Sequence, residues 1–191
     1  MFVIGSSNVA KMILTRDEIL SEIKRGRLKI DPFYETSLGE ISYDLSLGNE
    51  FVFVQPSRTA VIDVTDLSSL KCERIFSDHI ILQPHDFVLA RSREWIELPT
   101  DIVAIVSGKS SLARLGLEVE TAYVIAPGHA GYIILEISNR NRVAIKLKRG
   151  MLIAQLIFFR LSKPVRQYTD IGQFGIQKEI SLPKKLKFVS T

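Results

Sequence analysis

Residues 102–117 read IVAIVSGKSSLARLGL, an apolar run that is followed directly by a polar segment. The first five residues are Val, Ile and Ala only, which indicates a buried β-strand. Serines, a glycine and two cations follow, and such residues typically end a strand in a turn. The stretch therefore predicts a core strand that ends in a polar turn.

The same pattern of short apolar runs and turn residues recurs on both sides of this stretch. Runs rich in Val, Ile, Phe and Tyr lie at 43–47, 51–54, 61–64, 80–82, 87–90, 132–137, 144–147 and 153–159. Many short strands at such spacing are typical of a β-sandwich or barrel. A doubly wound parallel sheet is excluded, because it needs a helix between most strands and no long amphipathic pattern follows Gly26.

One short helix is expected near the start of the chain. Thr15-Arg16-Asp17-Glu18 has the sequence of a capping box, and apolar residues on one face follow at 19, 20 and 23. Gly26 comes directly after Arg25 and is a typical stop signal. The fold class expected is thus mainly β, with a short N-terminal helix.

Composition limits the function classes. With 191 residues, 46% of them apolar and 24% charged, the chain fits one globular domain. Its apolar runs are far shorter than a membrane span, and its first residues lack the apolar region of a secretory signal, so we expect a cytoplasmic protein. A formal charge of +4 suits a phosphate-bearing ligand, but basic and aromatic residues do not alternate along the strands as nucleic-acid binding would require.

A catalytic zinc ion is not expected. The three histidines and the single cysteine share no ligand spacing, so hydrolytic chemistry has to rest on other side chains. His129, beside the turn at 127–128, could approach a bound nucleotide, but a position at the surface is the favoured expectation.

The segment 107–117 is the first candidate for a binding site. Lys109, Arg114 and the hydroxyls of Ser110 and Ser111 can hold a phosphate together with backbone N–H groups at the start of a short helix. It is not a Walker A loop, because Val103 stands where the first glycine of that motif belongs. The alternative is a polar turn without a ligand, and composition does not decide between the two.

Glu136 is the second candidate. It is the only charged residue in the strand pattern YIILEISN of residues 132–139, and Ile134 and Ser138 share its face. A semi-buried pocket would desolvate the carboxylate, raise its pKa and make it a proton shuttle near neutral pH. The alternative is a glutamate that faces solvent.

These two segments carry a resemblance to a known family. Together with 121–122, 127–128, 131, 150–151 and 155–156, they closely resemble the dCTP deaminase family of the dUTPase-like superfamily. The resemblance spans about residues 12–180, including GRLKIDP at 26–32 and SYDLSLG at 42–48, whereas residues 1–11 have no counterpart. It implies a distorted antiparallel β-barrel or jelly roll at 12–163, an N-terminal extension at 1–11 and a mobile C-terminal arm at 164–191.

The resemblance also implies roles for residues and partners. The catalytic residues would be Glu136, Arg114 and Ser110, and the substrate-binding residues would be Lys109, Ser111, Thr121, Ala122, Gln155, Tyr168 and Gln177. The chain would form a homotrimer with sites between subunits. The ligand would be dCTP or dUTP, with Mg²⁺ bound through the triphosphate and no metal held by protein side chains.

The function predicted from these observations is hydrolytic deamination of dCTP to dUTP and ammonia, with Glu136 as both general base and general acid. Ala126 stands where the family usually has an aspartate, and in dUTPases that aspartate helps to position the hydrolytic water, so pyrophosphate release is not expected. Two alternatives remain open: a dUTP pyrophosphatase or bifunctional enzyme, and an inactive nucleotide-binding regulatory paralogue.

Overall fold

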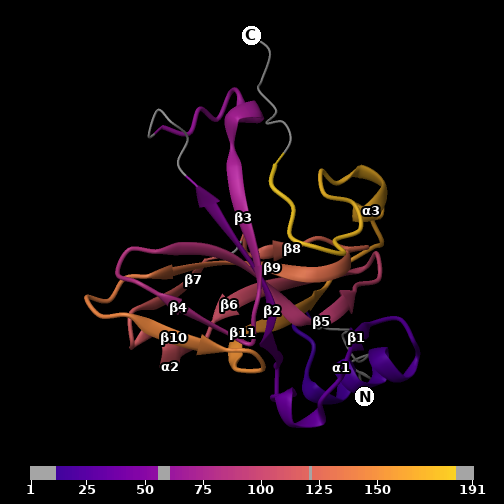
Figure 1. The fold of residues 1–191 in the computed structure, drawn as a ribbon. Helices are drawn as coiled ribbons and strands as arrows, with labels where there is room; N and C mark the ends of the chain where they lie inside the picture. Colours follow the sequence, from indigo (N-terminus) through magenta and orange to yellow (C-terminus); the bar gives the residue numbers. More distant parts are fainter. Residues whose placement is uncertain (1–11, 56–60, 121, 184–191) are drawn as a thin grey trace, which may run out of the picture.

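A computed structural model describes residues 12–55, 61–120 and 122–183 of the chain, and antiparallel strands dominate it (Figure 1). The elements are α1 (Arg16–Lys24), β1 (Lys29–Asp31), η1 (Glu35–Ser37), β2 (Ser42–Gln55), η2 (Leu67–Ser69), β3 (Lys71–Phe76), β4 (His79–Leu82), β5 (Phe87–Glu97), β6 (Ile102–Gly108), α2 (Ser110–Ala113), β7 (Leu117–Glu120), β8 (Val124–Ile125), β9 (Ala130–Asn139), β10 (Ile145–Lys148), β11 (Leu152–Arg160) and α3 (Tyr168–Ile171).

In the described part of the chain, nine strands form one antiparallel sheet. Its order is β7-β9-β5-β2-β11-β6-β8, with β1 paired to β5 and β3 paired to β2, while β4 and β10 form a separate pair. The sheet curls because β2 pairs first with β11, then with β5, and at its far end with β3. Register irregularities between β2 and β5, and between β5 and β9, accompany this bend.

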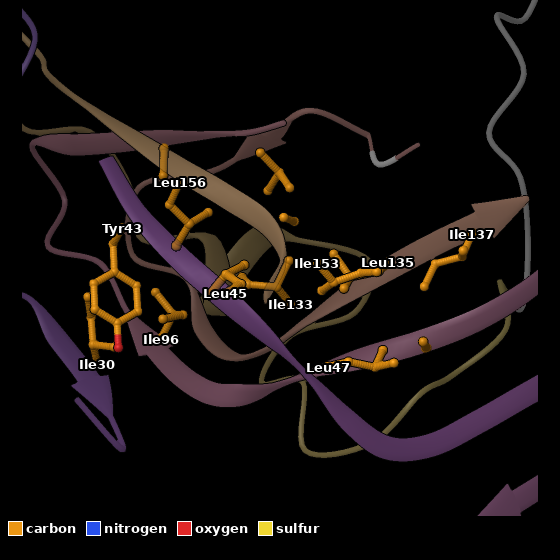
Figure 2. Packing of buried hydrophobic residues seen from close by; sticks show 14 of the residues in the cluster. Ile30, Tyr43, Leu45, Leu47, Ile96, Ile133, Leu135, Ile137, Ile153 and Leu156 are labelled. Atoms are coloured by element: carbon orange, nitrogen blue, oxygen red, sulfur yellow. The ribbon is translucent and has the colours of Figure 1, made fainter. Parts of the chain in front are cut away.

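The core fills the concave side of the curled sheet. In Figure 2, Leu45 and Leu47 of β2 extend into the same space as Ile133 and Leu135 of β9 and Ile153 of β11. Each of these side chains is at most 1% exposed, and burying one such side chain stabilises the fold by about 1.5–3 kcal/mol. Because burial alternates strictly along β9, the even-numbered residues, Glu136 among them, lie on the face opposite this core.

The expected fold class is confirmed: the protein is mainly β, an antiparallel and distorted barrel with few helices. The expected helix is α1, which begins after Thr15 with both halves of the capping box formed. The runs 43–47 and 51–54 belong to one continuous strand, β2, because the irregularity between them does not end the strand.

One strand expectation is wrong. Residues 61–64 form no strand, and Val61, Ile62 and Val64 are exposed. Strand β3, by contrast, was not predicted, because its sequence KCERIF is mostly polar and it pairs only with the outer end of β2.

The C-terminal arm packs against the sheet as far as it is described, to residue 183. It contains α3, and a short parallel bridge joins Gln177 to Gly131 at the start of β9. In Figure 1 the arm passes beside β9 and then runs next to β3, which projects from the body of the sheet. Among the described residues, no helix has the length and apolar character needed to span a membrane.

Candidate active site

A pocket of about 250 Å³ lies on the outer face of β9. Glu136 lines it and sits between Leu89 of β5 and residue 120 of β7 in the sheet. The other lining residues come from β5, the segment 122–129, β9 and the arm: Leu89, Ala122, Val124, Ile125, Ala126, His129, Ile134, Tyr168, Phe174, Gln177, Ser181 and Pro183. The arm therefore covers the face of β9 that the core does not use.

The pocket surrounds its carboxylate with apolar side chains. Glu136 is the single acidic residue among the described residues that line it, and Oε2 of Glu136 is buried. Leu89, Ile125 and Ile134 supply aliphatic surface around it. The semi-buried environment predicted for Glu136 is thus confirmed, because the arm covers a strand face that sequence alternation alone would leave in solvent.

His129 also lines this pocket, which makes the expectation of a surface residue wrong. The residue is 4% exposed, and its ring lies 6.3 Å, centroid to centroid, from that of Tyr168. Burial lowers the pKa of His129, and the contact of Nε2 with the Gly131 carbonyl oxygen at 3.3 Å opposes this only in part. The imidazole is therefore neutral at physiological pH and adds no charge to the pocket.

Two glycines allow the arm to approach this closely. Gly128 has φ +74°, and a Cβ there would lie 2.7 Å from the Cα of Gln167. Gly131 has φ +149°, and a Cβ there would lie 2.6 Å from the carbonyl oxygen of Gln177. The backbone of Gln177 donates to Ala130 O at 3.0 Å and accepts from Tyr132 N at 2.9 Å, so its position beside β9 is fixed.

The polar turn after β6 lines a second pocket, of about 470 Å³. Its lining residues are Ser107, Gly108, Lys109, Ser110, Ala113, Leu117, Glu118, Val119, Tyr123 and Gln155. Lys109 Nζ binds both carboxylate oxygens of Asp44 at 2.7 and 2.6 Å, and both side chains are partly buried. Asp44 was not anticipated as a site residue, although a charge inside the apolar pattern of β2 is a usable signal.

The predicted site residues fall into two groups. Glu136, Ala122, Tyr168 and Gln177 come together in the first pocket, and Lys109, Ser110 and Gln155 in the second. Among the residues that the structure describes, none lines both pockets. Ser111 and Arg114 are exposed on and after α2 and line neither of them, and Thr121 lies outside the described residues.

No group of three or more His, Cys, Asp or Glu side chains is positioned to hold a metal ion, as far as the chain is described. The second pocket offers hydroxyl and amide groups, an ammonium already bound to a carboxylate, and the Glu118 carboxylate, which is paired with Arg140. That donor set fits a phosphate ligand that brings its own cation better than it fits a metal held by the protein.

The antiparallel barrel has a counterpart among solved structures. A solved structure, the 2'-deoxycytidine 5'-triphosphate deaminase from Agrobacterium tumefaciens, superposes with a TM-score of 0.62 at 25% identity; the match covers 78% of this chain and 48% of that one. Residues 13–161 match the family model described as dCTP deaminase-like. The chain is a member of this family, as its sequence motifs predicted.

Relatives with similar sequences carry two names. A protein of Methanoculleus marisnigri named "dCTP deaminase, dUMP-forming" is 42% identical over 160 residues, which cover 82% of this chain and 85% of that protein. A protein of Thermomicrobium roseum named "dCTP deaminase" is 42% identical over 161 residues, 80% of this chain and 82% of that protein. The chain thus spans most of the length of both relatives.

Proposed function

We propose that this protein deaminates dCTP by hydrolysis. The observation that carries the proposal is Glu136, the one acid among the described residues of an apolar pocket on a barrel of the dCTP deaminase-like family. Hydrolytic deamination needs a group that removes a proton from water and returns a proton to the pyrimidine and the leaving amine. One carboxylate in a pocket closed by an arm can do both.

The proposed reaction balances with water as the only co-reactant. Glu136 takes a proton as water oxygen bonds to C4 of the cytosine ring, and it gives that proton to N3. Glu136 then takes the proton of the new C4 hydroxyl and gives it to N4, so that the C4–N4 bond breaks, N4 leaves as ammonia, and C4 becomes the carbonyl carbon of uracil. The neutral ring of His129 and the aliphatic side chains limit the access of bulk water, which strengthens the hydrogen bonds of the carboxylate.

The triphosphate is proposed to bind at the turn after β6. Lys109, Ser110, Ser111 and Arg114 supply two cations and two hydroxyls there, and Mg²⁺ would arrive on the phosphate oxygens. Because no described residue lines both the pocket at this turn and the Glu136 pocket, we propose that each nucleotide binds between two copies of the chain in a homotrimer. The proposed domain division is an extension at 1–11, a β domain at 12–163 and an arm at 164–191, in a cytoplasmic protein.

Formation of dUMP is the second candidate function. Its support is the name of relatives such as the Methanoculleus protein, which is 42% identical. Ala126 favours the first candidate, because its methyl group lines the pocket where a carboxylate would be needed to orient a second water towards the phosphates. The proposed products are therefore dUTP and ammonia.

Product analysis tests this proposal. Purified protein is incubated with dCTP and Mg²⁺, and ammonia, dUTP, dUMP and pyrophosphate are followed over time. Ammonia with dUTP supports the first candidate, whereas ammonia with dUMP and pyrophosphate supports the second. Tight nucleotide binding without ammonia would instead identify a regulatory paralogue. An Ala126→Asp variant that releases pyrophosphate, beside a wild type that does not, would assign the difference to this position.

A further inference from the structure

Glu50 is a buried carboxylate at some distance along β2 from the proposed catalytic residues. It is 2% exposed and forms ion pairs with Arg74 of β3 and, at 3.0 Å, with Arg91 of β5. Burying such a group is costly unless its partners satisfy it. Arg74 and Arg91 balance the charge of Glu50, and the same group of side chains also contacts the C-terminal arm.

Both backbone polar groups of one arm residue bind to this ion pair. Ile180 N donates to Glu50 Oε1 at 3.3 Å, and Arg74 Nη2 donates to Ile180 O at 2.7 Å. The Ile180 side chain is 1% exposed, and Arg74 Nη1 also lies 3.3 Å from Glu179 Oε2. Glu50 and Arg74 therefore hold residues 179–180 of the arm in place through hydrogen bonds and an ion pair.

A second attachment lies three residues earlier. Gln177 pairs through its backbone with Ala130 and Tyr132, and the Arg91 guanidinium lies 3.9 Å from the centre of the Tyr132 ring. Arg91 thus contacts both attachments, since its other partner is Glu50. Gln177 and Ser181 line the Glu136 pocket, so the two attachments hold this stretch of the arm beside the pocket.

We propose that Glu50 and Arg74 are positioning residues that hold residues 177–181 closed over the Glu136 pocket and thereby set the affinity for the nucleotide. Neither residue lines the pocket. A protein whose arm is closed only part of the time binds substrate more weakly in proportion to the closed fraction, while bound substrate reacts at the same rate. For its kinetic readout, this inference rests on the proposed deamination of dCTP.

The test compares Arg74→Met with Arg149→Met in the full chain. Arg149 forms a surface ion pair with Asp78 at 3.2 Å and is the matched control. In Arg74→Met we expect amide hydrogen exchange in residues 174–182 to become at least about tenfold faster and KM for dCTP to rise about tenfold, with kcat within about twofold of wild type. Arg149→Met should leave all three unchanged, and Arg74→Lys should restore part of the loss.

The outcomes separate this inference from the proposed function. Unchanged exchange in the arm of Arg74→Met overturns the inference, and so does faster exchange with an unchanged KM. If wild-type protein releases no ammonia from dCTP, the proposed function is overturned. Faster arm exchange in Arg74→Met would in that case still show that Glu50 and Arg74 hold the arm in place. If Arg74→Met does not fold, Arg74→Lys decides, because it keeps a cation beside Glu50 but lacks the guanidinium Nη2 that donates to Ile180 O; arm exchange and KM both equal to wild type in Arg74→Lys would then overturn the inference.

Discussion

At the scale of single residues, the proposed site depends on how two carboxylates are used. Glu136 lies against aliphatic side chains in its pocket, whereas Asp44 is bound through both oxygens to Lys109. The first arrangement suits proton transfer, and the second neutralises the cation closest to the proposed phosphate site. Each assignment predicts a different response to replacing the acid by its amide.

Glu136→Gln should reduce deamination by at least about a hundredfold while nucleotide affinity stays within about tenfold. The amide keeps the shape of the side chain but cannot accept the proton of the attacking water. Turnover is followed as ammonia release, and affinity by calorimetry with dCTP and Mg²⁺. Glu97→Gln, on the same sheet but outside the pocket, should react like wild type. More than a tenth of the normal rate in Glu136→Gln would mean that another group is the base.

Asp44→Asn should strengthen triphosphate binding, by about three- to tenfold at low salt, because it removes a negative charge beside the phosphate site. The asparagine oxygen can still accept a hydrogen bond from Lys109, so the ammonium stays in place. Calorimetry at two salt concentrations checks this, and the gain should shrink as salt rises. Weaker binding at both concentrations would show instead that the full ion pair is needed to position Lys109.

Sequence patterns were sufficient to predict that Glu136 lies in a pocket, but they did not predict the burial of His129 or of Ile180. A single charge in an apolar strand marks Glu136, and a dense motif marks the turn at 107–117. His129 next to a Pro-Gly turn has the pattern of a surface residue, but it is buried, and the Tyr168 ring of the arm lies beside it. Burial that depends on a contact between distant segments leaves no local pattern.

At the scale of elements, charged groups fasten α1 to the sheet. Glu22 of α1 is 3% exposed and accepts hydrogen bonds from Arg27 at 2.7 Å and from Arg160 of β11 at 2.8 Å. Arg27 also binds Asp101, in the turn before β6, at 2.7 Å. The start of α1 was predictable because the capping box is a local pattern. The network of Glu22 was not predictable, because it joins residues up to 138 positions apart in the sequence.

Glu22→Gln should lower the free energy of unfolding by about 1–3 kcal/mol at pH 7. Burial alone would raise the pKa of Glu22, but the hydrogen bonds from Arg27 and Arg160 outweigh it and hold the pKa below its ordinary value. The folded state therefore binds fewer protons than the unfolded state, so the stabilisation is present above about pH 4.5 and is lost as the pH falls through the folded pKa.

Urea unfolding at fixed protein concentration and several pH values between 7 and 3 measures this difference. The gap between wild type and Glu22→Gln should shrink as the solution becomes more acidic. Glu35→Gln, which loses an exposed ion pair with Arg16, should change stability little at any pH. A gap that is constant with pH would attribute the loss to packing and not to charge.

At the scale of the whole molecule, the two halves of the proposed site lie in pockets that share no lining residue in the described chain. The Glu136 pocket has no cation among its described lining residues, so it cannot by itself hold a triphosphate, and the pocket beside Lys109 has no apolar enclosure comparable to that around Glu136. If two copies of the chain associate, one copy would supply the Glu136 pocket and the other the pocket beside Lys109, so that together they form one complete site. This arrangement could not be read from periodicity or spacing, since these describe one chain only.

Mixing two inactive variants tests the shared site. Glu136→Gln removes the base and Arg114→Ala removes a cation of the proposed phosphate site, so each pure variant should be nearly inactive. The two variants are refolded together in equal amounts. A site is then intact if its Glu136 comes from an Arg114→Ala copy and its Arg114 comes from a Glu136→Gln copy. Each condition is met in half of the cases, so the mixture should regain about a quarter of wild-type deamination, and light scattering should report a trimer.

Mixing without refolding is the control and should restore little, provided the subunits do not exchange. If the refolded mixture is a trimer and yet shows only the sum of the two parent activities, each site is complete within one chain, and the two pockets cannot be halves of a shared site.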